Sequence, residues 1–321
     1  MVISVDREKL YGEYRPLLFS LAYRMLGTAS DAEDVVQDVF LRLEEKPPGD
    51  KEHMKAYLCK MAVNRCLDIL KRLRLQRELY IGPWLPEPIA IEADDPAAAY
   101  LQGEGVSFAI LLLLETLDPV ERAVYILREA FAFDYKAIAE ATGRSEAACR
   151  QTMSRLRPKI AAAQPPEGLM PTADAEPLVL QFLHAARTGD LTGMLELLHP
   201  DASLRSDGGG KVSAAVRPIV GAKAVAAFLG GLARKFAGAA DSAGTPELSQ
   251  KPGISEIAAS PASGPVAEFA LLPMNDQPGL LLTVDGQPDT ALLIESSAGR
   301  IHAVYIVRNP DKLEKIGRAG S

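Results

Sequence analysis

Apolar residues recur at helical spacing through the first part of the chain. After Ser30 they follow an i, i+1, i+4, i+5, i+8 spacing, which is typical of an amphipathic helix. Ser30 and Glu33 fit a capping box at its start. A second long helix is predicted from about Glu52 to Gln76. The apolar stripes of the two helices are Val35, Val36, Val39, Phe40 and Leu43, and then Ala62, Cys66, Ile69, Leu70 and Leu73.

The pattern over residues 106–163 predicts a helix-turn-helix. A buried helix at 106–116 precedes one that Asp118 caps, with Pro119 at its first position and an end near Ala130. A short helix over 135–141, a tight turn around Gly143 and a basic helix capped by Ser145 follow. This order is typical of a DNA-binding helix-turn-helix. The inner face of the basic helix is Cys149, Met153, Leu156 and Ile160.

Beyond residue 164 the pattern becomes mixed. This part contains 18 of the 25 glycines, and short apolar runs of strand length alternate with turns. Helices are expected over 176–188, 191–198 and 222–236. Helices wrapped by one curved antiparallel sheet would form an α+β, cone-shaped domain. The expected strands cover 202–206, 211–217, 254–259, 266–272, 280–284, 290–295 and 300–307.

Two proline-containing segments divide the chain into blocks. Four prolines between Leu79 and Tyr100 preclude a long helix, and we interpret this stretch as a flexible linker with polyproline II character. Three more prolines lie between Gln164 and Ala175. The expected organisation is a helical domain at 8–77, an acidic linker at 78–105, a helix-turn-helix domain at 106–163, a linker at 164–175 and the α+β domain at 176–316.

The net charge of −7 conceals a segregation of charge along the chain. Residues 51–78 carry eight Lys and Arg against three acidic residues, and residues 144–159 carry five against one. Between them, residues 78–121 contain nine Asp and Glu and no Lys or Arg. Two basic segments separated by an acidic one suggest two contact points on a polyanion, with a connector that the polyanion repels.

The sequence lacks the marks of a membrane or secreted protein. Its longest apolar run, Phe108–Leu114, has seven residues, whereas a membrane-spanning helix needs about 20. The N-terminal segment has no apolar stretch flanked by basic residues, so we expect no signal peptide. Three cysteines are too few for a disulfide scaffold, and we expect a cytoplasmic location.

The cysteines allow two interpretations. Cys59 and Cys66 lie two helical turns apart on one predicted face, with His53 nearby, so the pair could be redox-active or could bind a metal. The chain has no CxxC or HxxxC spacing, however. Buried structural cysteines are the simpler interpretation for these two and for Cys149, and we expect no metal and no cofactor.

Two stretches carry a family resemblance. The sequence SDAEDVVQDVFLRL at 30–43, followed by AVNRCLDILKR at 62–72, resembles region 2 of sigma-70-type sigma factors. Residues 117–157, from LDPVERAV to RQTMSRLR, resemble region 4. Because regions 1.1 and 3 have no counterpart, the chain is similar to the extracytoplasmic-function (ECF) type. Members of that family bind core RNA polymerase and direct it to promoters.

For region 2, the resemblance implies two binding faces. One polar helix face would bind the β′ clamp helices of polymerase, a merely solvated surface being the alternative. The long basic helix would offer donors to bases and cations to phosphates at the −10 element, although Asp68 could simply pair with Arg72. The loop at about 48–54 corresponds to the place where the family holds a flipped base. The polymerase set is Asp31, Asp34, Gln37 and Asp38, and the −10 set is Asn64, Arg65, Asp68, Lys71 and Arg72.

For region 4, the resemblance implies attachment to the polymerase β flap and recognition of the −35 element. Arg reads guanine and Gln reads adenine through paired hydrogen bonds, so Arg150 and Gln151 are expected to contact bases. Thr152 stands where the family is often basic. Arg155, Arg157 and Lys159 would more plausibly hold phosphates. Pro158 is expected to kink or end the recognition helix, which argues against the phosphate contact of Lys159. The DNA-binding set here is Arg144, Ser145, Arg150, Gln151, Ser154, Arg155 and Arg157.

The third block is similar to the SnoaL-like extension of one ECF subgroup, whose three marker segments stand here at 84–88, 207–211 and 309–313. The glycine-rich marker at 207–211 lacks the GxxxxGK[ST] frame of a phosphate-binding loop. It could be a plain hairpin turn, since glycines suit positive φ. The resemblance favours a regulatory contact with the sigma domains, and the segment at 309–313 is expected to dock near the same surface. The regulatory set is Trp84, Pro86, Asp207, Gly208, Gly209, Gly210, Lys211, Asn309, Pro310, Asp311, Lys312 and Leu313.

SnoaL-like proteins also include cyclases and isomerases that use an Asp or His as general base. No pair of candidates here has a diagnostic spacing, and a fold alone does not establish a function. We therefore predict an ECF sigma factor that is not an enzyme and that its fused C-terminal domain modulates. A SnoaL-like sensor or enzyme with helical partner domains is the alternative. Its candidate residues are His199, Asp201, Asp207, His302 and Tyr305.

Overall fold

The computed structural model describes residues 7–45, 54–90, 107–162, 170, 172–240, 248–251, 254–259, 267–314 and 316. The chain divides into two compact units. Unit 1 comprises Met1–Leu79 and Ile91–Gln164, and unit 2 comprises Tyr80–Ala90 and Pro165–Ser321. Three predicted segments fall wholly or partly outside the described residues: the loop at 48–54, apart from its last residue, residues 91–105 of the acidic linker, and residues 164–169 and 171 of the second linker.

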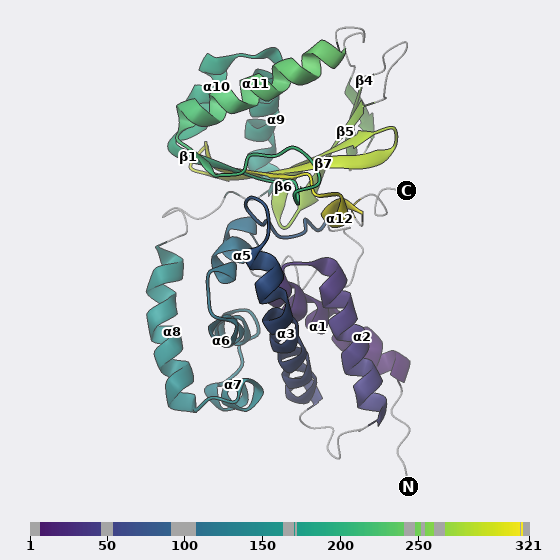
Figure 1. Ribbon diagram of the computed structural model, residues 1–321, viewed down its shortest axis with the longest axis vertical. Helices are drawn as coiled ribbons and strands as arrows, with labels where there is room; N and C mark the ends of the chain where they lie inside the picture. The colour runs from purple at the N-terminus through teal and green to yellow at the C-terminus, as the bar shows by residue number, and fades with distance from the viewer. Residues whose placement is uncertain are drawn as a thin grey trace. The chain divides into compact units, whose positions relative to one another are not determined.

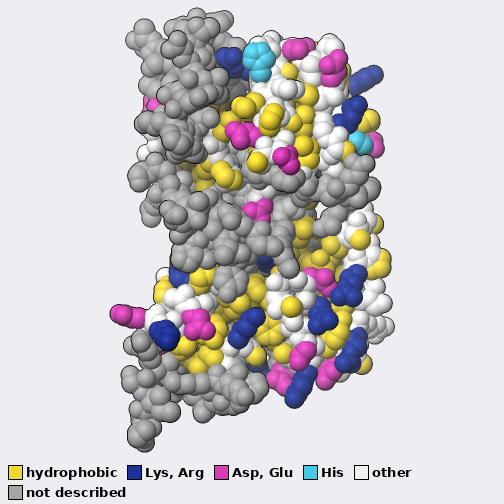
Figure 2. Space-filling model, turned by 180° about the vertical axis from the view of Figure 1, so that it is seen from behind, with side chains coloured by type: hydrophobic (Ala, Val, Ile, Leu, Met, Phe, Trp, Pro, Cys, Tyr) yellow, Lys and Arg dark blue, Asp and Glu magenta, His cyan; other side chains and the backbone are white. Residues whose placement is uncertain are grey.

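Unit 1 consists of helices in its described part (Figure 1). Helix α1 packs against both α2 and α3, and its middle, including Leu18 and Leu21, is fully buried. On the face shown in Figure 2, Lys and Arg side chains of this unit alternate with Asp and Glu side chains. The helices are α1 (Arg7–Leu26), α2 (Ala29–Glu45), α3 (Met54–Glu78), α5 (Phe108–Glu115), α6 (Pro119–Glu129), α7 (Tyr135–Thr142) and α8 (Glu146–Ala161).

The start of α2 differs from the prediction. The helix begins at Ala29, one residue before the predicted cap, and the Ala32 amide donates to the Thr28 carbonyl over 3.2 Å. The Thr28 hydroxyl contacts a carboxylate oxygen of Asp31 over 2.5 Å. The capping box centred on Ser30 is therefore wrong, because Thr28 supplies an equally suitable hydroxyl one turn before Asp31.

The helix-turn-helix forms as predicted. Side chains of Asp134 and Ser145 cap α7 and α8, and Gly143 ends α7 with a φ of 67°. Pro158 was expected to kink or end the recognition helix, and it does not end it, since α8 continues to Ala161. A proline this close to a helix end removes one backbone hydrogen bond, and the buried Ile160 keeps the last turn packed.

Unit 2 places three helices on one face of an eight-stranded sheet (Figure 1). The strand order is β2-β1-β8-β7-β6-β5-β4-β3, with β1 and β8 parallel and the other neighbours antiparallel. The helices are α9 (Thr172–Thr188), α10 (Leu191–Leu197), α11 (Ala222–Ala240) and the short α12 (Pro310–Leu313). The strands are β1 (Leu198–Asp207), β2 (Ile219–Val220), β3 (Leu248–Lys251), β4 (Ile254–Ala259), β5 (Ala267–Met274), β6 (Gln277–Val284), β7 (Gln287–Ser297) and β8 (Arg300–Val307).

The predicted α+β architecture is present, with two errors in the strands. The strand expected at 211–217 is absent, because the amides of Lys211 and Val212 both bond to the Gly208 carbonyl and turn the chain back. Only the two residues of β2 pair with β1 in this part. Strand β3 was not predicted.

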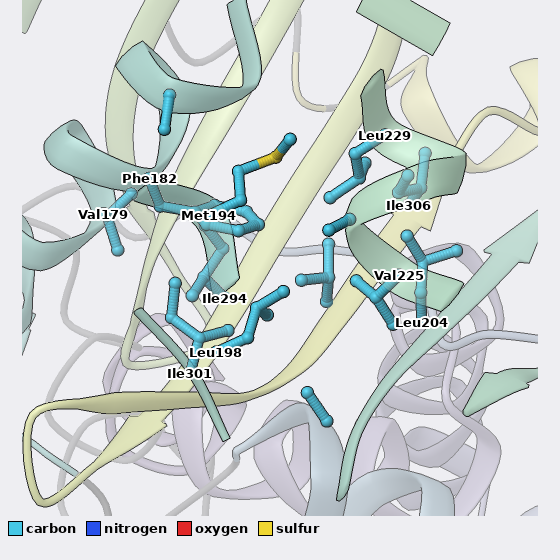
Figure 3. Close-up of a cluster of buried hydrophobic side chains, with 14 of the residues drawn as sticks. Val179, Phe182, Met194, Leu198, Leu204, Val225, Leu229, Ile294, Ile301 and Ile306 are labelled. Atoms are coloured by element: carbon cyan, nitrogen blue, oxygen red, sulfur yellow. The ribbon is translucent and has the colours of Figure 1, made fainter. Parts of the chain in front are cut away.

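A hydrophobic core fills the space between this sheet and its helices (Figure 3). Phe182 of α9 and Met194 of α10 meet Ile294 of β7 there, and all three side chains are buried. Val225 of α11 packs in the same cluster against Leu204 of β1. This burial decides which face of each strand points to the helices, so the alternate residues of β1, β7 and β8 point to the opposite face.

Candidate functional site

Asp207 lies at the end of β1, and its carboxylate is the centre of a buried polar site in unit 2. Its Oδ1 accepts hydrogen bonds from the Tyr80 hydroxyl (2.6 Å) and the Gly209 amide (2.9 Å). Its Oδ2 accepts from the Leu85 amide (2.9 Å) and from Lys312 Nζ (2.7 Å). A carboxylate has about four lone-pair sites, so four donors satisfy this group.

Lys312 of α12 is the cation of the site. Its side chain is 7% exposed and that of Asp207 is 0% exposed. The Lys312 ammonium also donates to the Leu85 carbonyl (2.5 Å) and lies 4.2 Å from the ring centre of Trp84 and 5.1 Å from that of Tyr80. Burial and the hydrogen bond to Asp207 raise the pKa of the Tyr80 hydroxyl. The pair is thus dry and fully bonded, the condition in which a buried ion pair is stable.

The glycines after Asp207 are required by close packing. A Cβ on Gly208 would lie 2.2 Å from the Val212 carbonyl oxygen, and one on Gly209 would lie 2.5 Å from the Asn309 side chain. Gly209 and Gly210 also have positive φ angles of 63° and 69°. The segment is therefore a tight turn, and its amides bond within the chain instead of facing a phosphate.

The segment at 309–313 packs against this turn. Asn309 caps α12 by accepting from the Asp311 amide (3.2 Å), and its Nδ2 donates to the Tyr80 hydroxyl (3.0 Å). Lys211 Nζ lies 2.7 Å from both carboxylate oxygens of Asp311, and both side chains are exposed. Leu313 is buried. The structure thus brings together the three marker segments that the sequence singled out, including Trp84 and the buried Pro86.

We call this arrangement the connector-binding site: Asp207, the turn 208–211 and the segment 309–313, which hold residues 80–90. A second attachment lies at the far end of that segment, where Ile89 exchanges two hydrogen bonds with Asn275 (3.0 and 3.1 Å) in the turn between β5 and β6. The flexible-linker interpretation is therefore wrong for residues 80–90, because buried side chains and hydrogen bonds at both ends make them part of unit 2.

The polar face of α2 divides into two kinds of residue. Asp34 and Gln37 are exposed, whereas Asp31 and Asp38 are half-buried. A carboxylate oxygen of Asp38 lies 2.5 Å from Arg65 Nε of α3. One residue predicted to bind polymerase is thus paired with one predicted to bind DNA, whereas the side chains of Asp34 and Gln37 face solvent.

The predicted −10 face of α3 is largely exposed. Asn64, Asp68, Lys71 and Arg72 are exposed, and Arg65 is half-buried. Asp68 pairs with Lys71 over 3.3 Å, not with Arg72 as the simpler alternative supposed. Exposed helical pairs three or four residues apart contribute only about 0.2–0.5 kcal/mol, so this pairing leaves Lys71 available to another anion.

The predicted −35 face of α8 is exposed at every position. Ser145 is occupied as the helix cap, and Arg150 pairs with Glu146 over 2.7 Å. The seven exposed residues are Arg144, Ser145, Arg150, Gln151, Ser154, Arg155 and Arg157.

Helix α6 supplies carboxylates to two arginines of α8. Arg155 pairs with Glu121, and Arg157 pairs with Glu129 over 2.8 Å. The hydrogen bond to Glu129 raises the pKa of Arg157. These exposed contacts are weak, and they show that the two cations have protein partners in the absence of DNA.

A buried cluster that the sequence did not reveal joins the two helical blocks of unit 1. Arg122 of α6 is 3% exposed and donates to the Met25 carbonyl and to Glu115, each over 2.6 Å. Arg77 of α3 also pairs with Glu115 and donates to the Leu26 carbonyl over 2.8 Å. Burial lowers the pKa of each arginine to about 10. One carboxylate thus holds two guanidinium groups against the C-terminal carbonyls of α1.

The three cysteines are buried and unbridged. Burial raises the pKa of the Cys59 thiol to about 12, and it also raises the pKa of Cys66. Reactive cysteines have lowered pKa values, so both have the environment of structural residues. Among the described residues, no group of three or more His, Cys, Asp or Glu side chains is placed to hold a metal ion.

The five candidates for a SnoaL-like enzyme do not form one site: His199, Asp201 and His302 are neighbours, whereas Asp207 and Tyr305 have partners elsewhere. Asp207 belongs to the connector-binding site, and the Tyr305 hydroxyl donates to Glu295 over 2.8 Å on the sheet face opposite the helices. His199 stacks on His302 with ring centres 4.4 Å apart. Asp201 is exposed. Apolar side chains form the core between the sheet and helices α9–α11 (Figure 3).

Comparisons with known proteins agree with this geometry. The family model described as Sigma-70 region 2 matches residues 10–76, and the one described as Sigma-70, region 4 matches residues 107–160. These matches define a sigma factor of the sigma-70 class, with α1–α3 as region 2 and α5–α8 as region 4. Among the described residues, the helices are too short or too polar to cross a membrane.

Relatives narrow the class further. The ECF RNA polymerase sigma factor SigJ of Mycobacterium tuberculosis is 38% identical over 228 residues, which cover 69% of this chain and 72% of SigJ. SigG of the same organism is 29% identical over 216 residues, 59% of this chain and 58% of SigG. The SigJ crystal structure matches with a TM-score of 0.70 at 31% identity and covers 95% of this chain and 97% of its own. The chain belongs to the ECF family of RNA polymerase sigma factors, as predicted, and these relatives are sigma factors, not enzymes.

Proposed function

We propose that this sigma factor binds core polymerase through α2 and region 4, reads the −10 element with α3 and the −35 element with α8, and acts in the cytoplasm. Unit 2 sets the spacing of regions 2 and 4 by holding the chain between them. The proposed role of unit 2 in setting this spacing rests on the buried Asp207–Lys312 pair, which forms hydrogen bonds directly to Tyr80 and Leu85 of the connector.

The physical role of unit 2 follows from chain entropy. A free connector leaves regions 2 and 4 with many relative arrangements, and ordering them on a promoter costs conformational entropy. A covalently attached unit acts at high effective concentration. Holding residues 80–90 therefore favours some arrangements and disfavours others, which is how it would modulate transcription without a separate protein.

The polymerase-binding role of α2 predicts a specific loss. Asp34→Lys should reduce affinity for core polymerase at least about tenfold, equivalent to 1.4 kcal/mol, because Asp34 is exposed on the proposed clamp-binding face. Titration of labelled full-length protein with core polymerase measures this. Glu13→Lys makes the same charge change at an exposed position of α1, outside that face, and should bind normally. Asp38 is unsuitable because its replacement also releases Arg65.

Replacing Arg150 or Arg157 of α8 by alanine should affect promoter binding in different ways. Arg150→Ala should cost about 1–3 kcal/mol on the preferred −35 sequence and relax base preference, whereas Arg157→Ala should weaken all sequences alike. The measurement is holoenzyme binding to promoters that carry each single-base change at −35. Unchanged affinity and ranking in both variants would show that α8 does not read the promoter.

A further inference from the structure

Tyr135 places an aromatic ring beside two arginines of the helix-turn-helix. It is the first residue of α7, directly after the cap residue Asp134. The guanidinium carbon of Arg128 lies 4.8 Å from the ring centre, and that of Arg150 lies 5.1 Å from it. Both distances are within the cation–π range of about 6 Å. One ring therefore connects the end of α6, the start of α7 and the first turns of α8.

Each arginine has one further restraint. Arg128 donates to the Phe133 carbonyl over 2.8 Å, which fixes it to the loop before α7. Arg150 bonds to Glu146 over 2.7 Å while its side chain stays 56% exposed. The ring and the carboxylate together hold an exposed arginine that would otherwise sample many rotamers.

The ring differs chemically from the carboxylates that hold the other arginines of α8. A carboxylate occupies N–H donors and neutralises charge, as for Arg155 and Arg157. An aromatic face contacts a guanidinium without accepting its in-plane N–H groups. Those N–H groups form the edge that reads O6 and N7 of guanine. Stacking can therefore persist when Arg150 gives up its exposed hydrogen bond to Glu146 and contacts a base.

We propose that Tyr135 is a positioning residue for Arg150 and that it sets base selectivity at the −35 position that Arg150 reads. The inference rests on the proposed −35 role of Arg150. Loss of the ring leaves the charge of Arg150 intact but frees its side chain. Selectivity then falls while the electrostatic part of DNA binding is kept.

The test uses full-length holoenzyme and a panel of promoters with single-base changes at −35. Tyr135→Leu should reduce discrimination at the position read by Arg150 about two- to fivefold, and Tyr135→Phe, which keeps the ring, should stay within about twofold of the original protein. The dependence of binding on salt should be unchanged in both, since no charge is altered. Tyr135→Met repeats the ring removal with a flexible side chain, in case the leucine variant fails to fold.

Three results would overturn the inference: undiminished discrimination in Tyr135→Leu and Tyr135→Met, an equal loss on every promoter, or a loss in Tyr135→Phe as large as in the leucine variant. Arg150→Ala is measured on the same panel. If that variant keeps full discrimination, the proposed role of Arg150 is wrong and the inference falls with it. If Arg150→Ala loses discrimination and the ring-removing variants do not, only the role of Tyr135 is wrong.

Discussion

Lys312→Met is expected to lower the free energy of unfolding of unit 2 by about 3–5 kcal/mol, the usual cost of leaving one charge of a buried pair uncompensated. The substitution keeps the length of the side chain but removes the cation beside Asp207 and the donor to the Leu85 carbonyl. Residues 80–90 should then separate from the sheet more readily. Trp84 is the only tryptophan of the chain, and its ring contacts the Lys312 ammonium, so its fluorescence reports on this release.

The measurement is urea unfolding monitored by Trp84 fluorescence. In Lys312→Met, the emission should shift to the red at lower urea concentrations than those that unfold the whole protein. Lys211→Met is the matched control, because Lys211 pairs with Asp311 in an exposed position and such pairs contribute at most about 1 kcal/mol. The double variant Asp207→Asn with Lys312→Met should recover part of the loss, since it leaves no unpaired charge. Equal stability of the two lysine variants would contradict the buried site.

The same variants test regulation. In transcription reconstituted with core polymerase, Lys312→Met should change promoter output relative to the original protein, whereas Lys211→Met should not. A released connector with unaltered output would show that the site stabilises unit 2 without modulating transcription.

Glu115→Ala is expected to destabilise unit 1 by about 3–5 kcal/mol. Glu115 is the carboxylate shared by Arg77 and Arg122, and Arg122 is almost completely buried. Without it, two guanidinium groups face each other with no anion between them. The loss of stability should appear in urea unfolding monitored by circular dichroism, which reports on the helices of this unit.

Glu129→Ala is the control for this variant, because Glu129 pairs with Arg157 at the surface and its loss should cost no more than about 1 kcal/mol. Glu115→Gln, which keeps the shape and one acceptor, should fall between the two. Trp84 emission should be unchanged in all three, since Trp84 belongs to unit 2. A Glu115→Ala protein as stable as Glu129→Ala would mean that the cluster contributes little.

Much of the helical structure was predictable because its signals are local. Caps such as Asp118 and Ser145, the turn at Gly143 and the spacing of Cys149, Met153, Leu156 and Ile160 all lie within one or two helical turns. The errors arose where local signals compete. Thr28 and Ser30 are both suitable caps, and Pro158 stands near enough to a helix end to be tolerated.

Exposure of the DNA-binding face of α8 was also predictable, since helical spacing separates its buried and outward residues. Ion-pair partners were not. Arg155 and Arg157 find theirs on α6, 34 and 28 residues away, and Asp38 finds its partner on α3. Spacing within one helix carries no information about which neighbouring helix presents a carboxylate.

By itself, the sequence determined the two helical regions, the helix-turn-helix, the α+β character of the C-terminal part and the family, because periodicity, caps and motif order are properties of short stretches. The sequence also identified the three marker segments, but it did not show how they are arranged in space. Only the tertiary structure decided that residues 80–90 belong with unit 2, that Asp207 and Lys312 form one buried pair and that Glu115 holds two arginines. Apart from the Arg122–Glu115 pair, these contacts join residues 38 to 229 positions apart. The strength of a charge pair also depends on how completely the surrounding fold excludes water.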